Sequence, residues 1–227
     1  MRYKAVIFDL FGTLVGEAPP QEYGRVRAEM AAILSLPAED FARLWAETME
    51  ARSTGLFDSI QANIAHICRA LGASASAPRI DAAARVRVDF TRGLLTPRPD
   101  AEETINRLKE KGNKVGLVSN CSPEVPGLWR ELSIATLVES PVFSCAVGLR
   151  KPDPRIYLLA CDRLGVRPKD CLYVGDGASG ELDGAAAVGM RPVRIPAPDE
   201  EVYRPAHAER WQGPTIPALK DVLPLVG

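Results

Sequence analysis

The fold is decided by the stretch Ala5-Val6-Ile7-Phe8-Asp9-Leu10-Phe11-Gly12-Thr13-Leu14-Val15. Its first four residues are apolar without a break, which is typical of a short strand buried on both faces, and Gly12 then interrupts the pattern. In an open parallel sheet, ligands bind just beyond the carboxyl ends of the strands, so Asp9 stands where chemistry takes place. An aspartate that caps a turn by bonding to its own backbone produces the same local pattern. The rest of the chain distinguishes these two interpretations.

Further strand-like runs follow at wide intervals, each after a segment with helical spacing. The runs are Lys114–Val118, Leu172–Val174 and Pro192–Ile195. The helical patterns include Ala101–Lys111 and Pro154–Leu164, where apolar residues recur on one face. Strands that alternate with helices predict an α/β fold in which right-handed crossovers join the strands into a parallel sheet.

The segment from residue 16 to residue 97 departs from this alternation because it contains no convincing strand. Its patterns predict four helices, over Gln21–Leu34, Ala38–Arg52, Ser59–Leu71 and Ile80–Thr91. We therefore expect an all-helical cap, residues 16–97, inserted after the first strand of a core formed by residues 1–15 and 98–227. A closing helix is expected over Ile216–Val226.

The composition is that of an ordinary globular protein and excludes several classes of function. A formal net charge of −1 leaves no basic excess for nucleic acid or an anionic membrane surface. No apolar run approaches the roughly 18 residues that span a bilayer, and no secretory signal precedes the first strand. The five cysteines are scattered, odd in number and without a CxxC pair, which favours reduced thiols and argues against a zinc site. We therefore expect a cytoplasmic protein.

Polar residues follow the other predicted strands as well. Ser119 and Asn120 come directly after the second strand and offer hydroxyl and amide donors to an anion. Lys151 adds a positive charge just before the helix that begins near Pro154. Asp9 is a carboxylate that can attack an electrophilic centre and hold it as an acyl intermediate. Each of these residues alone is also compatible with a turn or an exposed surface. Together with Asp176, which ends a later strand-like run, they make four polar strand ends or following loops in one chain, and this favours a shared site.

Two further acids follow the third strand-like run. Asp176 comes at its end and Glu181 begins the next helical segment. Together with Asp9, these carboxylates would repel one another strongly unless a cation lay between them. Mg²⁺ binds through one or two carboxylates, water and substrate phosphate, so the pattern favours this ion. Asp183 is the alternative second acid, although two helical positions turn it roughly 200° away from Glu181.

Four segments together resemble the four motifs of the haloacid dehalogenase-like hydrolases. They are Phe8-Asp9-Leu10-Phe11-Gly12-Thr13-Leu14, Val118-Ser119-Asn120, Lys151-Pro152-Asp153-Pro154, and Val174-Gly175-Asp176 with Ala185-Ala186-Ala187-Val188-Gly189-Met190. The resemblance covers the whole chain and implies a Rossmann-like, doubly wound core with a helical cap inserted after the first motif. The implied roles are nucleophile for Asp9, binding of the phosphoryl or carboxylate group for Ser119 or Thr13 with Lys151, and Mg²⁺ binding for Asp176 and Glu181 beside Asp9.

Phe11 departs from the pattern of the family's phosphatases, most of which have a second aspartate at this position as general acid for the leaving alcohol. A phenyl ring neither donates nor accepts a proton, and general acid–base help is worth about 10²–10⁴ in rate. A phosphatase with Phe11 should therefore be slow unless its leaving group needs little protonation or another group supplies the proton. We expect the Phe11 side chain to contact substrate, and its backbone carbonyl can still serve as a metal ligand.

Phe11 also fits the family's 2-haloacid dehalogenases, which have an aromatic residue there and use no metal. In those enzymes a cap arginine helps to hold halide and substrate, whereas the matching stretch here, Ala42-Arg43-Leu44-Trp45-Ala46, has alanine in its place. Their fourth motif is of the Ser-Ser-x-Asn kind, whereas this chain has Gly175-Asp176-Gly177 followed by Glu181. Two acids beside the nucleophile disfavour a metal-free site for an anionic acid.

The sequence therefore predicts a Mg²⁺-dependent phosphohydrolase that cleaves a small phosphorylated metabolite through an aspartyl-phosphate on Asp9. The alternatives are a metal-independent 2-haloacid dehalogenase and a catalytically weak binding or interaction module on the same fold. The presence of Asp9, Lys151 and Asp176 together argues against a decayed site. We expect a small phosphorylated molecule as the partner, with no nucleic acid and no membrane, and a monomer or homodimer.

Overall fold

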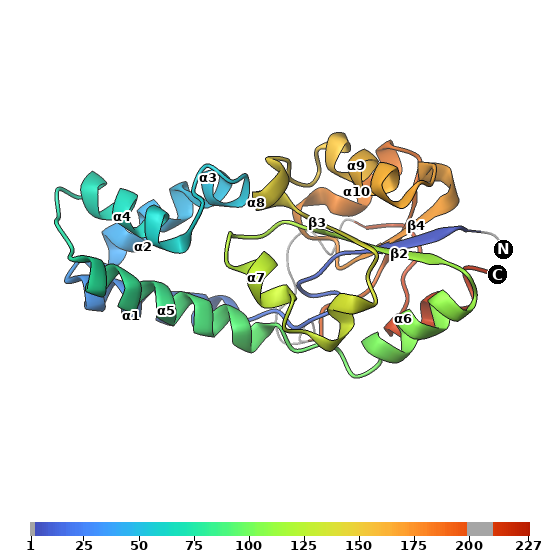
Figure 1. Ribbon diagram of the computed structural model, residues 1–227, viewed down its shortest axis with the longest axis horizontal. Helices are drawn as coiled ribbons and strands as arrows, with labels where there is room; N and C mark the ends of the chain where they lie inside the picture. The colour runs from blue at the N-terminus through green and yellow to red at the C-terminus, as the bar shows by residue number, and fades with distance from the viewer. Residues whose placement is uncertain (1–2, 199–210) are drawn as a thin grey trace.

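The computed structural model describes residues 3–198 and 211–227, and its centre is a five-stranded parallel sheet (Figure 1). The strands are β1 (Ala5–Phe8), β2 (Lys114–Ser119), β3 (Ser140–Phe143), β4 (Cys171–Gly175) and β5 (Arg191–Arg194). Their order is β3-β2-β1-β4-β5, so the chain winds outward in both directions from β1. This confirms the expected doubly wound, Rossmann-like α/β core. The residue after β1 consequently lies in the middle of the sheet's carboxyl edge, between β2 and β4.

Helices cover both faces of the sheet because its strands are apolar on both sides. The core helices are α6 (Ala101–Glu110), α7 (Val125–Trp129), α8 (Ser144–Val147), α9 (Pro154–Leu164) and α10 (Glu181–Ala187). On one face, Val6 and Phe8 of β1 share an apolar cluster with α6 and α7. On the other face, Ala5 and Ile7 share a second cluster with α9 and α10. Successive side chains of β1 thus point to opposite faces, as strand geometry requires.

Five helices stand between β1 and α6 in the sequence. They are α1 (Pro20–Leu34), α2 (Ala38–Glu47), α3 (Met49–Ser53), α4 (Ile60–Ala70) and α5 (Ala77–Leu94). These helices enclose an apolar cluster of their own, which includes Phe41, Trp45 and Ile64. In Figure 1 they form a separate group at the end of the molecule opposite the chain termini, toward which the carboxyl ends of the strands point. The arrangement is the one expected of an inserted cap.

One expected helix is divided in the structure, and one strand was not expected. The helix expected over Ala38–Arg52 is divided at Thr48, whose hydroxyl donates a hydrogen bond to the carbonyl of Leu44 at 2.8 Å. Such bonds from a threonine to its own helix favour a bend. The edge strand β3 was not expected because it is only four residues long and contains Pro141, a residue that sheets tolerate at their edges.

The prediction of a closing helix over Ile216–Val226 was wrong. The structure has only a short 3₁₀ turn there, over Leu219–Val222. Pro217 and Pro224 explain the difference, because proline cannot donate the backbone hydrogen bond that continues a helix. Residues 199–210 lie outside the described part of the chain. Among the helices of residues 3–198 and 211–227, none is both long and apolar enough to cross a membrane.

Candidate active site

Asp9 lies at the carboxyl end of the central strand and is only 5% exposed. Its backbone N–H donates to the carbonyl of Val174 on β4 at 2.9 Å, so the sheet itself fixes its position. Lys151 Nζ donates to Asp9 Oδ1 and forms an ion pair with it, and Thr13 Oγ1 donates to Oδ2 at 3.3 Å. Burial and the charge of Glu181 raise the pKa of Asp9 to about 6, against the opposing effect of Lys151. Both carboxylate oxygens are thus oriented, as a nucleophile requires.

Lys151 is held at its backbone and at its ammonium group. Its backbone N–H donates to Asn120 Oδ1 at 2.8 Å, and Asn120 Nδ2 donates to its carbonyl at 3.1 Å. Its Nζ donates to Asp9, to Glu181 and, at 3.2 Å, to the hydroxyl of Tyr173. Burial acts to lower the pKa of Lys151, but the charges of Asp9 and Glu181 outweigh burial and raise it above its ordinary value. The ammonium group therefore stays charged, and the Asn120 side chain positions Lys151.

Glu181 begins α10 and is completely buried. Its Oε2 accepts hydrogen bonds from Lys151 and, at 2.7 Å, from the Tyr173 hydroxyl, while its Oε1 accepts from the N–H of Gly177 at 3.0 Å. Gly175 makes room for this carboxylate, because a Cβ at that position would lie 2.1 Å from Oε1. Both oxygens of Glu181 thus accept hydrogen bonds from the protein. Glu181 therefore contacts Lys151 directly and would contact a metal ion through a water molecule.

Asp176 follows β4 and lies next to Asp9 at the same edge of the sheet. Its Oδ1 accepts from the N–H of Ala178 at 2.8 Å, and its Oδ2 lies where a Cβ on Gly12 would approach to 2.8 Å. Gly12 also has a φ of +72°, so both space and conformation require glycine there. Burial and the charge of Asp9 raise the pKa of Asp176 to about 6. Asp183, the alternative acid, is exposed and lies outside this group.

The three acids Asp9, Asp176 and Glu181 form a buried group whose ligand oxygens lie within 4.8 Å of one another. Among the described residues, Lys151 alone forms ion pairs with them, so three carboxylates face one ammonium group. A divalent cation would compensate the remaining negative charge, and carboxylate oxygens are ligands that Mg²⁺ prefers. The donor set therefore fits Mg²⁺, and the carboxylates of Asp9 and Asp176 could hold the ion directly.

Ser119 ends β2 at the same edge of the sheet and is completely buried. Its Oγ has no hydrogen-bond partner within the described part of the chain. Buried hydroxyl groups nearly always have a partner, since leaving one unpaired costs free energy. The Ser119 hydroxyl is therefore a free donor beside Asp9, although Ser119 does not line the cavity at this edge, whereas the Thr13 hydroxyl is directed to Asp9.

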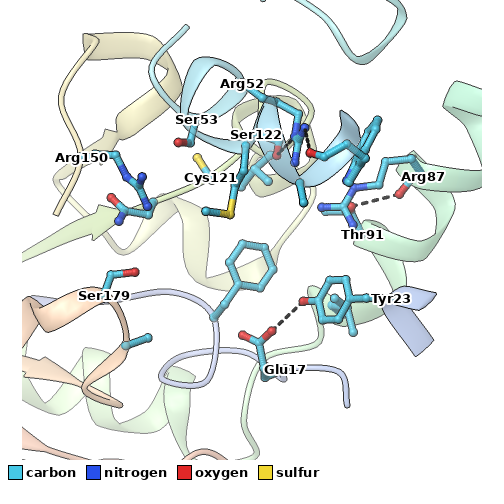
Figure 2. Close-up of a pocket in the computed structure, with 18 of the residues that line it drawn as sticks. Glu17, Tyr23, Arg52, Ser53, Arg87, Thr91, Cys121, Ser122, Arg150 and Ser179 are labelled. Carbon is cyan, nitrogen blue, oxygen red and sulfur yellow. Dashed lines mark hydrogen bonds between the residues drawn. The ribbon is translucent and has the colours of Figure 1, made fainter. Parts of the chain in front are cut away.

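A cavity of about 400 Å³ lies between this edge of the sheet and the helices α1, α2, α3 and α5. Asp9, Phe11 and Lys151 line it from the core, and side chains of α1, α2, α3 and α5 line it from the other side. Figure 2 shows Tyr23, Arg52, Arg87 and Thr91 of these helices around the same space as the core residues Cys121, Ser122, Arg150 and Ser179. Its volume is within the range of small-molecule sites.

Several residues of this site were not expected from the sequence. Tyr173 is part of an apolar strand, and only its hydroxyl contacts with Lys151 and Glu181 reveal a polar role. Glu17 lines the cavity, where it accepts a hydrogen bond from the Tyr23 hydroxyl at 2.6 Å. Burial raises the pKa of Glu17 above its ordinary range. Glu17 comes six residues after Phe11, and no sequence pattern marks it as part of a site.

Known proteins similar to this chain include both phosphatases and dehalogenases. A family model described as a haloacid dehalogenase-like hydrolase matches residues 3–189. The glyceraldehyde 3-phosphate phosphatase of Methanopyrus kandleri is 33% identical over 204 residues, which cover 85% of this chain and 83% of that protein. The (S)-2-haloacid dehalogenase 4A of Burkholderia cepacia is 37% identical over 102 residues, 44% of each chain. The solved 2-haloacid dehalogenase of Pseudomonas syringae pv. Tomato DC3000 has the same fold, with a TM-score of 0.73 over 99% of this chain and 97% of that chain at 23% identity.

Proposed function

Because the chain belongs to the haloacid dehalogenase-like hydrolases, we propose that it is a Mg²⁺-dependent phosphohydrolase that acts through an aspartyl-phosphate on Asp9. The observation that supports this most strongly is the buried group of three acids, Asp9, Asp176 and Glu181, with one lysine. A divalent cation requires such a surplus of negative charge, and the bound cation then attracts the phosphate group. A metal-free site for an anionic haloacid is weakened by it.

One position in the wall of the cavity departs from the dehalogenase pattern, although Arg27, Arg52 and Arg150 line the cavity elsewhere. In the stretch from Ala42 to Ala46, where the dehalogenase resemblance implies an arginine, Ala46 lines the cavity and offers no charge to a halide. Arg43 of the same stretch is exposed and pairs with Asp40 and Glu47 on the surface of α2. It therefore does not take the place of that arginine.

The reaction proposed for this site has two steps. A carboxylate oxygen of Asp9 attacks the phosphorus atom, and the bond from phosphorus to the leaving oxygen breaks. Lys151 orients that carboxylate and offers its positive charge to the phosphoryl oxygens, while Ser119 donates its free hydroxyl. Water then attacks the phosphorus of the acyl phosphate, which releases inorganic phosphate and restores the Asp9 carboxylate. Mg²⁺ bound by Asp9 and Asp176 would neutralise negative charge on the carboxylates and on the phosphoryl group.

A substrate screen separates the proposal from both alternatives. Aryl, acyl and alkyl phosphates and 2-haloacids are each incubated with the protein after treatment with EDTA, with and without added Mg²⁺. We expect phosphate release that requires Mg²⁺ and no release of halide. Metal-independent halide release would establish the dehalogenase instead, and no turnover of any substrate would favour a binding module.

Metal affinity should depend on the acids in a definite order. Loss of an outer-shell partner typically costs about 10–100-fold in metal affinity, so we expect Glu181→Gln to raise the Mg²⁺ concentration for half-maximal activity by about this factor. Asp176→Asn should raise it further, because it removes a direct ligand. Asp183→Asn is the matched control, since Asp183 is exposed on the same helix as Glu181. A metal requirement altered by Asp183→Asn and not by Glu181→Gln would contradict this assignment.

The absence of an acid at Phe11 should make the rate depend steeply on the leaving group. An aryl or acyl phosphate, whose leaving group departs as a stable anion, should be hydrolysed much faster than an alkyl phosphate. Phe11→Asp should raise the rate on alkyl phosphates by part of the roughly 10²–10⁴ that general acid catalysis supplies, with a smaller gain on aryl phosphates. Equal gains on both, measured as kcat over a series of leaving-group pKa values, would show that the new aspartate is not the leaving-group acid.

Glu17 is the group to examine if the wild-type rate proves insensitive to the leaving group. Among the described residues that line the cavity, Asp9 and Glu17 are the two acidic ones. Its pKa is raised by burial, so its carboxyl group holds a proton to a higher pH than an exposed glutamate does. If Glu17 supplies the proton, Glu17→Gln will slow alkyl phosphates selectively, and the wild-type rate on them will fall as pH rises through the pKa of Glu17.

Residues 16–97 are proposed to act as a cap over this site, with hinges near residues 16–20 and 95–99. The structure has several close contacts across the boundary. Arg52 Nε donates to Ser122 Oγ at 3.2 Å, and a Cβ on Gly55 would lie 2.3 Å from the carbonyl oxygen of Cys145. Closure of this kind would shield an acyl phosphate from stray nucleophiles.

A further inference from the structure

The cavity that contains Asp9 is also lined by four arginines, and three of them have no acidic partner among the described residues. Arg87 pairs with Glu124 at 3.2 Å. Arg27, Arg52 and Arg150 form no ion pair within residues 3–198 and 211–227. Surface arginines elsewhere on the chain could remain unpaired in water without cost. Here Arg52 is buried and Arg27 and Arg150 are half-buried, and all three line a cavity whose only described acids are Asp9 and Glu17.

Arg52 is the most deeply buried of the three, at 5% exposure. Its guanidinium group stacks on the ring of Trp45, 4.1 Å from the centroid. Its Nε donates to Ser122 Oγ at 3.2 Å and its Nη1 to Asn63 Oδ1 at 2.8 Å, and both acceptors are neutral. Its Nη2 has no hydrogen bond to any residue that the structure describes. Burial and the charge of Arg87 lower the pKa of Arg52 only to about 10, so it keeps its charge at neutral pH.

Arg27 and Arg150 add unused donors to the same cavity. The Nε atom of each is buried and has no hydrogen-bond partner in the described part of the chain. In Figure 2, Arg52, Arg87 and Arg150 lie in the upper part of the view, whereas Glu17 lies in the lower part with Tyr23. Buried charges and donors in proteins are normally paired, because leaving them unpaired is costly. A ligand that brings oxyanion acceptors would satisfy all three guanidinium groups.

We infer that Arg27, Arg52 and Arg150 form a second anion site, so that the substrate is a phosphate monoester with another oxyanion, a carboxylate or a second phosphate, at its far end. The inference rests on the proposed phosphohydrolase function and adds the class of substrate to it. With its phosphoryl group at Asp9 and Lys151, such a substrate would extend through the cavity toward the helices. Guanidinium groups suit this role, since their N–H donors match carboxylate and phosphate oxygens in pairs.

Three esters that differ at the far end test the inference: glycerol 3-phosphate, 3-phosphoglycerate and glycerol 1,3-bisphosphate. We expect kcat/KM for at least one of the two anionic esters to exceed that for glycerol 3-phosphate by about tenfold or more. The anionic ester with the higher kcat/KM shows whether the site prefers a carboxylate or a phosphate at the far end. Arg52→Gln should remove this preference, mainly by raising KM, and Arg52→Lys should restore part of it. The exposed Arg43→Gln is the control, and Arg27→Gln serves as a second test if Arg52→Gln does not fold.

Each outcome of this experiment has a distinct meaning. Equal kcat/KM for the three esters in the wild type would overturn the inference. So would an equal loss on all three in Arg52→Gln, since it would show that Arg52 only joins the helices to the core. If no ester is hydrolysed, an aryl phosphate included, the phosphohydrolase proposal fails by itself. The anion site is then tested by calorimetric titration, in which 3-phosphoglycerate and glycerol 1,3-bisphosphate are each added to the Asp9→Asn protein and to the Asp9→Asn, Arg52→Gln double variant. Weaker binding of either ester by the double variant would support the inference. Equal affinities of both proteins for both esters would overturn it.

Discussion

Replacing Asp9 by asparagine should lower turnover of every phosphate ester by on the order of 10³-fold or more while leaving the fold intact. An amide cannot form the acyl phosphate, so no other feature of the site compensates for this change. Asparagine has nearly the same shape and can still accept the hydrogen bond from Lys151 that Asp9 Oδ1 accepts. Initial rates on an aryl phosphate and a thermal melt of the same preparation provide the measurement.

A matched change elsewhere shows whether the loss is specific to Asp9. Asp162 is an exposed aspartate on α9, so Asp162→Asn removes one carboxylate without touching the site. We expect it to keep the wild-type rate. Residual activity of Asp9→Asn above a few per cent of wild type, with deamidation excluded by mass spectrometry, would place the nucleophile at another residue.

The second large effect is expected for Lys151→Ala. Lys151 is 3% exposed and is the only described cation paired with Asp9 and Glu181, so its loss leaves two buried carboxylates without a counter-charge. Loss of one preorganised stabilising group typically costs about 10²–10³ in kcat, and we expect at least this decrease. Removing one partner of a buried ion pair lowers the free energy of unfolding by about 3–5 kcal/mol. The loss is smaller where the remaining carboxylates take up protons and become neutral.

Two further variants make the Lys151 experiment specific. Lys151→Met fills the same volume without the charge, so it separates the electrostatic loss from the cavity that alanine leaves. Lys169→Ala removes an exposed lysine and should behave as wild type. Measurements of kcat at saturating Mg²⁺ and of thermal melting are made on all three. An unaffected kcat in Lys151→Ala would favour the binding-module alternative.

The core of the fold could be predicted because its signals are local. The apolar run Ala5–Phe8 and its counterparts at β2, β4 and β5 each end in a polar or small residue, and helical spacing separates them. β3 could not be predicted in the same way. Its four residues are held by the register with β2, in which Val118 lies opposite Val142, rather than by an apolar pattern of their own. The closing segment shows the opposite case, where an apolar pattern suggested a helix that its prolines do not permit.

Part of the candidate site could be predicted because Asp9, Ser119 and Asp176 end a strand or directly follow one, and parallel strands share one carboxyl edge. Lys151 instead comes from the loop between α8 and α9, and its hydrogen bond to Asp9 joins it to this edge. The helical side of the cavity could not be predicted, since its contacts join distant parts of the chain. Arg52 and Ser122, for example, are 70 residues apart in the sequence, and no local pattern marks either residue as part of a site.

Chemical trapping on Asp9 tests the central claim most directly. Borohydride reduces an aspartyl-phosphate to homoserine, so it is added during steady hydrolysis of a phosphate ester in the presence of Mg²⁺. Peptide mass spectrometry then examines the segment that contains Asp9. The proposed mechanism predicts homoserine at position 9 only when both substrate and Mg²⁺ are present. Steady phosphate release with residue 9 unmodified, or with the modification on a different carboxylate, would contradict it.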